Sequence, residues 1–217
     1  MTETKGQNAS SRQTGEDELA EETDSTEKTE EAPKEDYVSD QLALKTWSVV
    51  ARHLHEGGGI VTLVKAWDKQ NEGFLIFPSY SGQDPDAIKP DIWMAWRHVL
   101  KAPLGGHTHI RDYAEVTDAL PIASEGALAA IDAEHGFAME EARRRFREGE
   151  PGLVALVLRV YHLPRAYKFY DVAEKEGPGE FAPLPFDVAL EDLEPVVADD
   201  AEFEFRRSRI RRVLGQS

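Results

Sequence analysis

The sequence contains no cysteine, and none of its apolar runs approaches the roughly 18 residues that a membrane-spanning helix needs. The missing cysteine excludes disulfide scaffolds, cysteine-ligated zinc or iron–sulfur sites and thiol nucleophiles. The first residues also lack the basic and apolar regions of a signal peptide. We therefore expect a cytoplasmic protein with no membrane partner.

Positive charge is scarce as well: 25 Lys and Arg stand against 41 Asp and Glu, a formal net charge of -16 in 217 residues. The shortage is greatest in residues 1–40, which hold 13 acidic and 4 basic residues and few large apolar side chains. Such a segment cannot bury enough apolar surface to offset its chain entropy. We predict a disordered acidic tail over residues 1–40 and a single domain over residues 41–217.

Apolar spacing predicts the elements in the first half of this domain. Residues 42–54 carry apolar side chains at helical spacing, which predicts one amphipathic helix. Residues 60–64 and 74–77 are short β-branched or aromatic runs joined by a polar turn, which predicts an antiparallel hairpin. Residues 92–100 return to helical spacing after Pro90, so we expect a second helix there.

The second half alternates between the same two patterns. Residues 107–116 alternate and predict a strand, and helices are expected from Ser124 and around residues 139–146. Residues 153–161 are nearly all apolar, which is typical of a strand buried on both faces at the centre of a sheet.

The chain is predicted to end with an irregular proline-rich stretch over residues 177–185 and a helix capped by Asp199 or Asp200. Together these elements predict an α+β fold, in which a mostly antiparallel sheet carries flanking helices and is preceded by the acidic tail.

Several of these segments resemble a known prokaryotic family. They are residues 42–47 (Leu-Ala-Leu-Lys-Thr-Trp), residues 74–80 (Phe-Leu-Ile-Phe-Pro-Ser-Tyr) with Gln83, residues 156–161 (Leu-Val-Leu-Arg-Val-Tyr), and Pro195-Val196 followed by Phe203, Arg207, Ile210 and Leu214. On these residues the body of the chain resembles the DUF1802 family, a domain of unknown function. Family members occur beside restriction-endonuclease-like domains, so the resemblance implies a link to restriction and modification.

The chain departs from the family pattern at two places. It has Lys65-Ala66-Trp67 where the family suggests a basic, glycine-containing turn, and Gly82 where the family suggests a histidine. Any role that this histidine has in relatives is therefore not available here.

The common catalytic motifs are absent from the sequence. A restriction-type nuclease places an acidic residue two positions before a lysine, and Glu3-Thr4-Lys5 in the predicted tail is the one Glu-x-Lys. Gly57-Gly58-Gly59 precedes a strand and is followed by no Gly-Lys-Ser or Gly-Lys-Thr, so a phosphate-binding loop is not indicated. We therefore favour a protein that is not an enzyme.

One strand offers a candidate metal or phosphate site. Alternation over residues 107–116 places His107, His109, Arg111, Tyr113 and Glu115 on one face. His107, His109 and Glu115 could ligate a divalent metal, while Arg111 could contact a phosphate; a solvated polar face is the simpler alternative. His53 and His55 also lie two apart, but on a predicted helix they point to different sides and are interpreted as unrelated surface or boundary residues.

Two further sets of residues are candidates for nucleic-acid contact. The chain ends in a cluster of arginines that could bind phosphates, although cations also stabilise a helix C-terminus: Arg206, Arg207, Arg209, Arg211 and Arg212. Trp67, Tyr80 and Gln83 are candidates in loops, where an exposed ring beside positive charge could stack on a base.

Two function classes follow. The first is a non-catalytic accessory or binding module for nucleic acid or for a restriction–modification protein, with no cofactor. The alternative is a metal-dependent hydrolase or nuclease that uses His107, His109 and Glu115. An assembly protein that binds neither metal nor nucleic acid is the third possibility.

Overall fold

The computed structural model describes residues 39–68, 72–101, 107–148, 152–170 and 179–215. The chain divides into two units, Met1–Ala32 and Pro33–Ser217, and the fold described here belongs to the second. The predicted acidic tail lies outside the described residues apart from Ser39 and Asp40.

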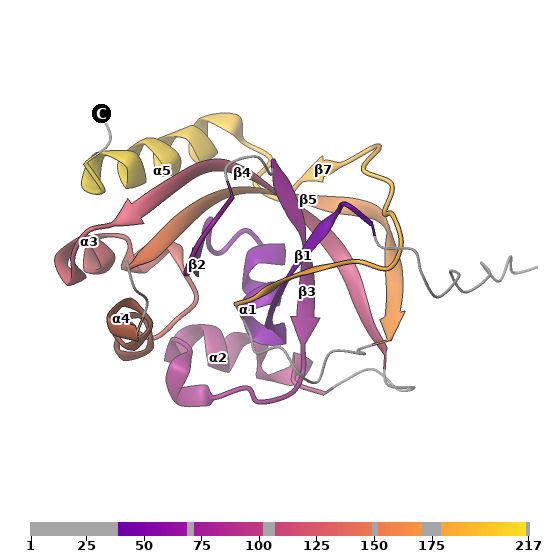
Figure 1. Cartoon of the computed structure of the whole chain (residues 1–217), viewed down its shortest axis with the longest axis horizontal. Helices are drawn as coiled ribbons and strands as arrows, with labels where there is room; N and C mark the ends of the chain where they lie inside the picture. Colours follow the sequence, from indigo (N-terminus) through magenta and orange to yellow (C-terminus); the bar gives the residue numbers. More distant parts are fainter. Residues whose placement is uncertain (1–38, 69–71, 102–106, 149–151, 171–178, 216–217) are drawn as a thin grey trace, which may run out of the picture. The chain divides into compact units, whose positions relative to one another are not determined.

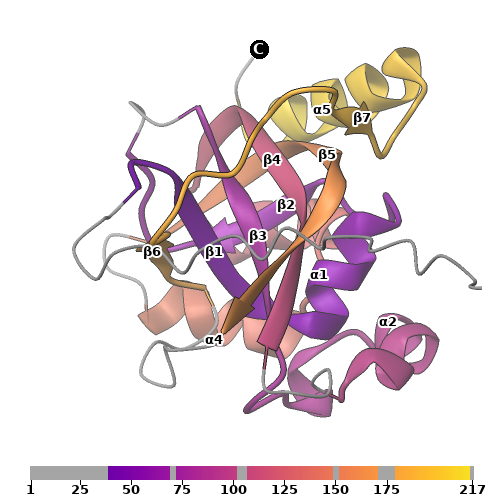
Figure 2. The same ribbon diagram turned by 90° about the vertical axis from the view of Figure 1, so that its right-hand side faces the viewer.

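A seven-stranded sheet forms the body of the described residues (Figures 1 and 2). Its strands run in the order β2-β5-β4-β3-β1-β6, and the short β7 pairs with β5. β1 and β3 are parallel, whereas the other pairs are antiparallel. The strands are β1 (Leu42–Trp47), β2 (Val61–Val64), β3 (Gly73–Ser79), β4 (His107–Ile122), β5 (Leu153–Tyr170), β6 (Phe181–Pro183) and β7 (Glu194–Pro195).

Five α-helices and three short 3-10 helices accompany this sheet in the described part of the chain. Local signals set their starts: Ser124 Oγ accepts from the Ala127 amide, and an Asp199 carboxylate oxygen accepts from the Ala201 amide. The helices are α1 (Ser48–His55), η1 (Pro85–Ala87), α2 (Pro90–Trp96), η2 (Arg97–Val99), α3 (Glu125–Ala130), η3 (Asp132–Glu134), α4 (Met139–Glu148) and α5 (Asp200–Val213). The predicted α+β class with a mostly antiparallel sheet is confirmed.

Among the described residues, none of the helices has both the length and the apolar composition that a transmembrane segment requires.

The single helix predicted over residues 42–54 is wrong. Residues 42–47 form β1, and the helix α1 starts only at Ser48. Because Ala43 to Trp47 are all buried, both faces of this strand are covered and the apolar spacing does not distinguish a strand from a helix.

The predicted hairpin of residues 60–64 and 74–77 is also wrong. Both segments form strands, but β2 pairs with β5, whereas β3 lies between β1 and β4. Strand partners are chosen here by long-range packing of the sheet and not by the turn that joins the two strands. The stretch over residues 177–185, predicted to be irregular, contributes the short strand β6, which pairs with β1.

The strand predicted at the centre of the sheet is β5, an interior strand between β2 and β4. Ala155, Leu156, Val157 and Leu158 are each fully buried, as the apolar run predicts. Beyond this run β5 continues to Tyr170, and its second half carries the candidate site together with β4 and α1.

Candidate functional site

The candidate site lies at an irregularity in the pairing of β4 with β5. Ile110 is opposite Tyr167, but Asp112, two residues later, is opposite His162. An advance of two residues along β4 therefore corresponds to an advance of five residues along β5. Pro164 lies in this longer segment of β5. Proline is tolerated in a strand at such a bulge because no ladder hydrogen bond is required there.

The bulge also changes which side chains of β4 share a face. Ile110 and Tyr113 pack in the same apolar cluster, although strict alternation would place them on opposite faces. The predicted common face of His107, His109, Arg111, Tyr113 and Glu115 is therefore wrong beyond the bulge. Asp112 lines the same cavity as His109 and Arg111 instead.

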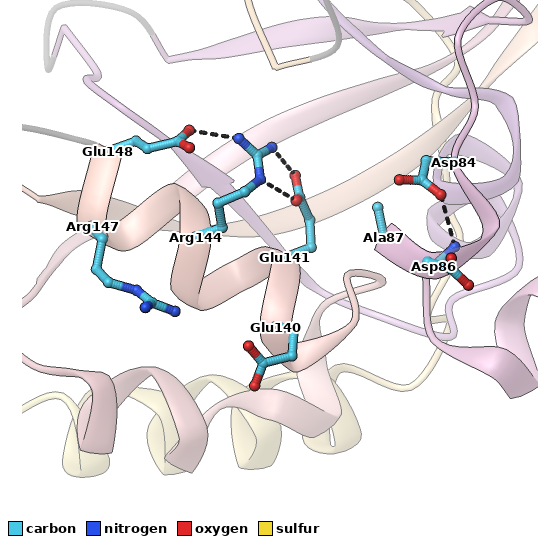
Figure 3. Close-up of a pocket in the computed structure, with 8 residues that line it drawn as sticks. All are labelled: Asp84, Asp86, Ala87, Glu140, Glu141, Arg144, Arg147 and Glu148. Carbon is cyan, nitrogen blue, oxygen red and sulfur yellow. Dashed lines mark hydrogen bonds and ion pairs between the residues drawn. The ribbon is translucent and has the colours of Figure 1, made fainter.

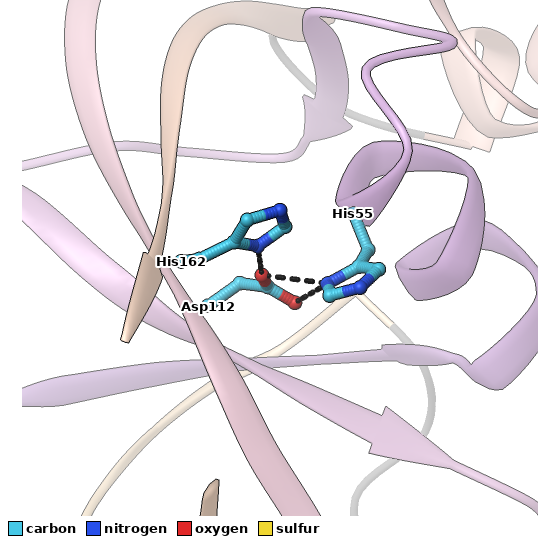
Figure 4. A group of neighbouring side chains, drawn as sticks. All are labelled: His55, Asp112 and His162. Atoms are coloured by element: carbon cyan, nitrogen blue, oxygen red, sulfur yellow. Dashed lines mark hydrogen bonds and ion pairs between the residues drawn. The ribbon is translucent and has the colours of Figure 1, made fainter. Parts of the chain in front are cut away.

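Two histidines flank the carboxylate of Asp112 (Figure 4). His55 Nδ1 lies 2.9 Å from Oδ1 and 3.0 Å from Oδ2, and His162 Nδ1 lies 2.8 Å from Oδ1. The two imidazole rings are 4.3 Å apart between centroids and inclined by 49°. His55 is the last residue of α1, so three elements far apart in the sequence converge on this carboxylate.

The cluster is accessible from one side. The Asp112 side chain is 7% exposed, whereas His55 and His162 are 22% and 36% exposed. If each neutral imidazole carries its proton on Nδ1 and donates it to Asp112, each Nε2 keeps a lone pair for proton transfer. The same three side chains are common ligands of divalent metals.

A cavity of about 380 Å³ adjoins the cluster. Three cationic side chains, Arg52, Lys101 and Arg111, lie on its walls, and the one carboxylate among its lining residues is Asp112. The walls are made by Ser48, Ala51, Arg52, His55, Pro78, Tyr80, Val99, Lys101, His109, Arg111 and Asp112.

The cationic side chains around this cavity interact with neighbouring groups. Arg52 forms an ion pair with Glu56, the residue that follows α1, and its guanidinium lies 5.4 Å from the centroid of the Trp96 ring. His109 has its pKa lowered from 6.5 by burial, and by the nearby charges of Arg111 and Lys168. At neutral pH His109 is therefore a neutral hydrogen-bonding group on the cavity wall.

The predicted metal ligands do not come together as a set. The rings of His107 and His109 are 5.1 Å apart, but Glu115 lies six residues beyond His109 on the same strand, about 20 Å away at roughly 3.3 Å per residue. The Glu115 carboxylate instead accepts a hydrogen bond of 3.0 Å from the Tyr161 hydroxyl.

The three candidates that were predicted in loops do not lie together in one site. Tyr80 lines the cavity. Gln83 supports α1: its Oε1 accepts from the Val49 amide and lies 3.1 Å from Ser48 Oγ. Trp67 is partly buried, and its ring packs against those of Phe74 and Phe181 at 5.6 and 5.0 Å.

The C-terminal arginines pair with acidic residues on the domain. Arg206 and Arg209 both contact the carboxylate of Glu134, a buried residue. Arg207 and Arg211 approach Asp118 at 2.6 and 3.7 Å. Four of the five predicted phosphate contacts thus attach α5 to the domain, while Arg212 is exposed.

Sequence reasoning missed His55, Asp112 and His162. His55 lines the cavity whereas His53 does not, which agrees with the prediction that the two histidines point to different sides of the helix. One signal was available: Asp112 lies within a predicted strand between apolar neighbours of the buried face, where an isolated carboxylate is rarely placed without a partner.

A second cavity, of about 570 Å³, is a weaker candidate (Figure 3). Its charged groups pair with one another: Arg144 donates to Glu141 at 2.8 Å and to Glu148 at 2.6 Å. Asp84 accepts from the Asp86 amide and so caps η1. These pairings leave less charge for a ligand than the cavity beside Asp112 offers.

Comparison with curated proteins gave no match. A family model described as a domain of unknown function, DUF1802, matches residues 43–209. This range includes α1, β4 and β5, and therefore His55, Asp112 and His162. Because the match covers most of the sequence, the chain belongs to the DUF1802 family, as its resemblance in the strands and the final helix predicted.

Proposed function

We propose that this domain binds a phosphate-bearing ligand, such as a nucleotide or the end of a nucleic acid, in the cavity beside Asp112. The observation that carries the proposal is the convergence of Arg52, Lys101 and Arg111 on one cavity of about 380 Å³. Guanidinium and ammonium groups are the side chains that bind phosphate most strongly. The volume lies within the usual range for small-molecule sites.

The electrostatic setting supports this choice. The chain has a formal net charge of -16, and a cavity with three cations on its walls is a favourable place for an anionic ligand on such a protein. Tyr80 on the wall offers an aromatic ring for a base or sugar. The proposal keeps the binding module favoured by the sequence but moves its contact surface from α5 to the cavity.

Titration of tag-free protein with inorganic phosphate, AMP and a 5′-phosphorylated oligonucleotide tests this function. Arg111→Ala should weaken binding by about tenfold or more, because a hydrogen bond to a charged group contributes about 1.5–3 kcal/mol. Arg212→Ala is the matched control and should leave the affinity unchanged. Absence of binding, or loss of affinity in Arg212→Ala but not in Arg111→Ala, contradicts the proposal.

Hydrolysis of a phosphoester is a second candidate function. The observation in its favour is the pair of imidazoles held by Asp112 at the edge of the same cavity, since such groups can transfer protons. This reading moves the predicted hydrolase site away from His107, His109 and Glu115. Hydrolysis of a dinucleotide to a mononucleotide and a nucleoside, abolished in His162→Gln, would support it, and binding without turnover would favour the non-catalytic module. The association with restriction and modification, and the cytoplasmic location, stay predictions.

A further inference from the structure

The carboxylate of Asp112 is buried between two imidazoles. It is almost fully buried, and burial of an ionised carboxylate is costly unless a cation or several hydrogen bonds compensate it. Within the described part of the chain, the ion pairs of Asp112 are with His55 and His162, and no arginine or lysine forms one with it. The two imidazoles meet the carboxylate through Nδ1 at 2.8–3.0 Å, and a metal ion bound among the three side chains would add a positive charge beside it.

The arrangement of the three side chains suits a metal ion. One ligand atom of each lies within 4.8 Å of the ligand atoms of the other two. An ion bound at about 2.1 Å in tetrahedral geometry holds its ligand atoms about 3.4 Å apart, so side-chain movements of about 1 Å are sufficient. The three come from α1, β4 and β5, whose packing fixes their relative positions.

We propose that His55, Asp112 and His162 bind one divalent first-row transition-metal ion, such as Zn²⁺, with its remaining coordination positions open to the cavity. The ion places a positive charge against the buried carboxylate. An oxygen of the phosphate-bearing ligand completes the coordination, and this part of the proposal rests on the function proposed above.

The ligand types favour such an ion over Mg²⁺ or Ca²⁺. Two imidazole nitrogens and one carboxylate form a set that suits Zn²⁺, Mn²⁺ or Fe²⁺, whereas Mg²⁺ and Ca²⁺ prefer oxygen ligands. Arg52, Lys101 and Arg111 stand on the cavity walls and do not pair with Asp112, so they remain placed for an anion bound to the metal. The bulge that turns Asp112 toward His162 is what brings the third ligand into the set.

Zinc binding to tag-free, chelator-treated protein tests the site. Titration calorimetry and elemental analysis should give one Zn²⁺ per chain, with Mg²⁺ binding much more weakly. Two ligand variants are used in case one of them does not fold. Asp112→Asn keeps the shape of the side chain, and His162→Gln changes a partly exposed residue. Each should weaken Zn²⁺ binding by about a hundredfold, because each removes one ligand. Circular dichroism establishes that the variants are folded.

The single variant His107→Ala is the matched control, because His107 is a histidine of β4 that belongs neither to the proposed site nor to the lining of the cavity. It should retain one Zn²⁺ per chain. Absence of stoichiometric Zn²⁺ in the wild type, unchanged affinity in both ligand variants, or loss of the ion in the control overturns the proposal.

Titration of inorganic phosphate with and without Zn²⁺ separates the metal site from the proposed function. Zn²⁺ binding without phosphate binding would leave the metal site intact and refute the ligand. If the protein binds no Zn²⁺ and its affinity for phosphate is the same with and without Zn²⁺, the metal site alone is refuted.

Discussion

Arg206 should contribute strongly to the stability of the domain, because it compensates a buried charge. Its Nε and Nη2 donate to Glu134 Oε2 at 3.0 and 2.8 Å, and its Nη1 donates to the Gly57 carbonyl oxygen at 3.0 Å. The side chain of Glu134 is 4% exposed and that of Arg206 is 16% exposed. Replacement by methionine removes these donors but keeps much of the aliphatic stem.

The size of the effect follows from the burial of Glu134. Removal of one partner from a buried ion pair costs about 3–5 kcal/mol, because the other charge stays uncompensated. Arg209 remains on Glu134 Oε1, so the lower end of this range is expected for Arg206→Met, about 3 kcal/mol. In a domain of this size, such a loss lowers Tm by about 6–12 °C.

Urea unfolding followed by circular dichroism measures this loss. Arg212→Ala is the control, since an exposed surface substitution changes the free energy of unfolding by about 0.5 kcal/mol or less. The double variant Arg206→Met, Glu134→Gln should cost less than the sum of the single variants, because it removes both charges. A loss below about 1 kcal/mol for Arg206→Met would refute the reasoning, since it is the contribution of a solvated pair.

Three further perturbations test the stability of the domain. Acid should destabilise the fold, because burial first and the charge of Lys89 second lower the pKa of both His53 and His135 from 6.5 to about 4. Between these pH values the unfolded chain binds more protons, so the free energy of unfolding should fall as pH decreases from 6.5 to 4, by up to about 3 kcal/mol for each histidine. Urea titrations at several pH values measure the fall, and His135→Gln should reduce it; a flat profile contradicts the assignment. Separately, Gly59→Ala should destabilise by about 1–3 kcal/mol, because its Cβ would lie 2.8 Å from the Glu134 carbonyl oxygen. Gly126→Ala in α3 meets nothing closer than 3.7 Å and should stabilise by up to about 1 kcal/mol, so thermal unfolding of the two variants should shift in opposite directions.

The parts of the fold that were predicted correctly depend on local chemistry. Ser124 and Asp199 cap the helices that they were expected to begin, and Pro90 opens α2. These signals act within one turn of helix, so the sequence contains them in full. The incorrect elements, β1 and the partners of β2 and β3, depend on neighbours that are distant along the chain.

The candidate site was harder to predict for a related reason. Asp112 meets His162 because β5 has three more residues than β4 across the bulge, and strict alternation contains no sign of such an excess. His55 reaches the same carboxylate because α1 begins only at Ser48, six residues later than its apolar spacing suggests. Arg111 and Tyr80 could be selected from residue type alone, and both lie on the cavity.

The position of β1 affects how the domain is made in the cell. One edge of β1 pairs with β3, but the other pairs with β6, and Leu42 is opposite Pro183, 141 positions along the chain. At typical translation rates of about 5–20 residues per second, the ribosome needs on the order of ten seconds to deliver that partner. During this interval an apolar strand presents an open edge, on which neighbouring chains can aggregate. Fragments that end before Phe181 keep this edge open permanently, so we expect nascent-chain chaperones to be needed until β6 has emerged.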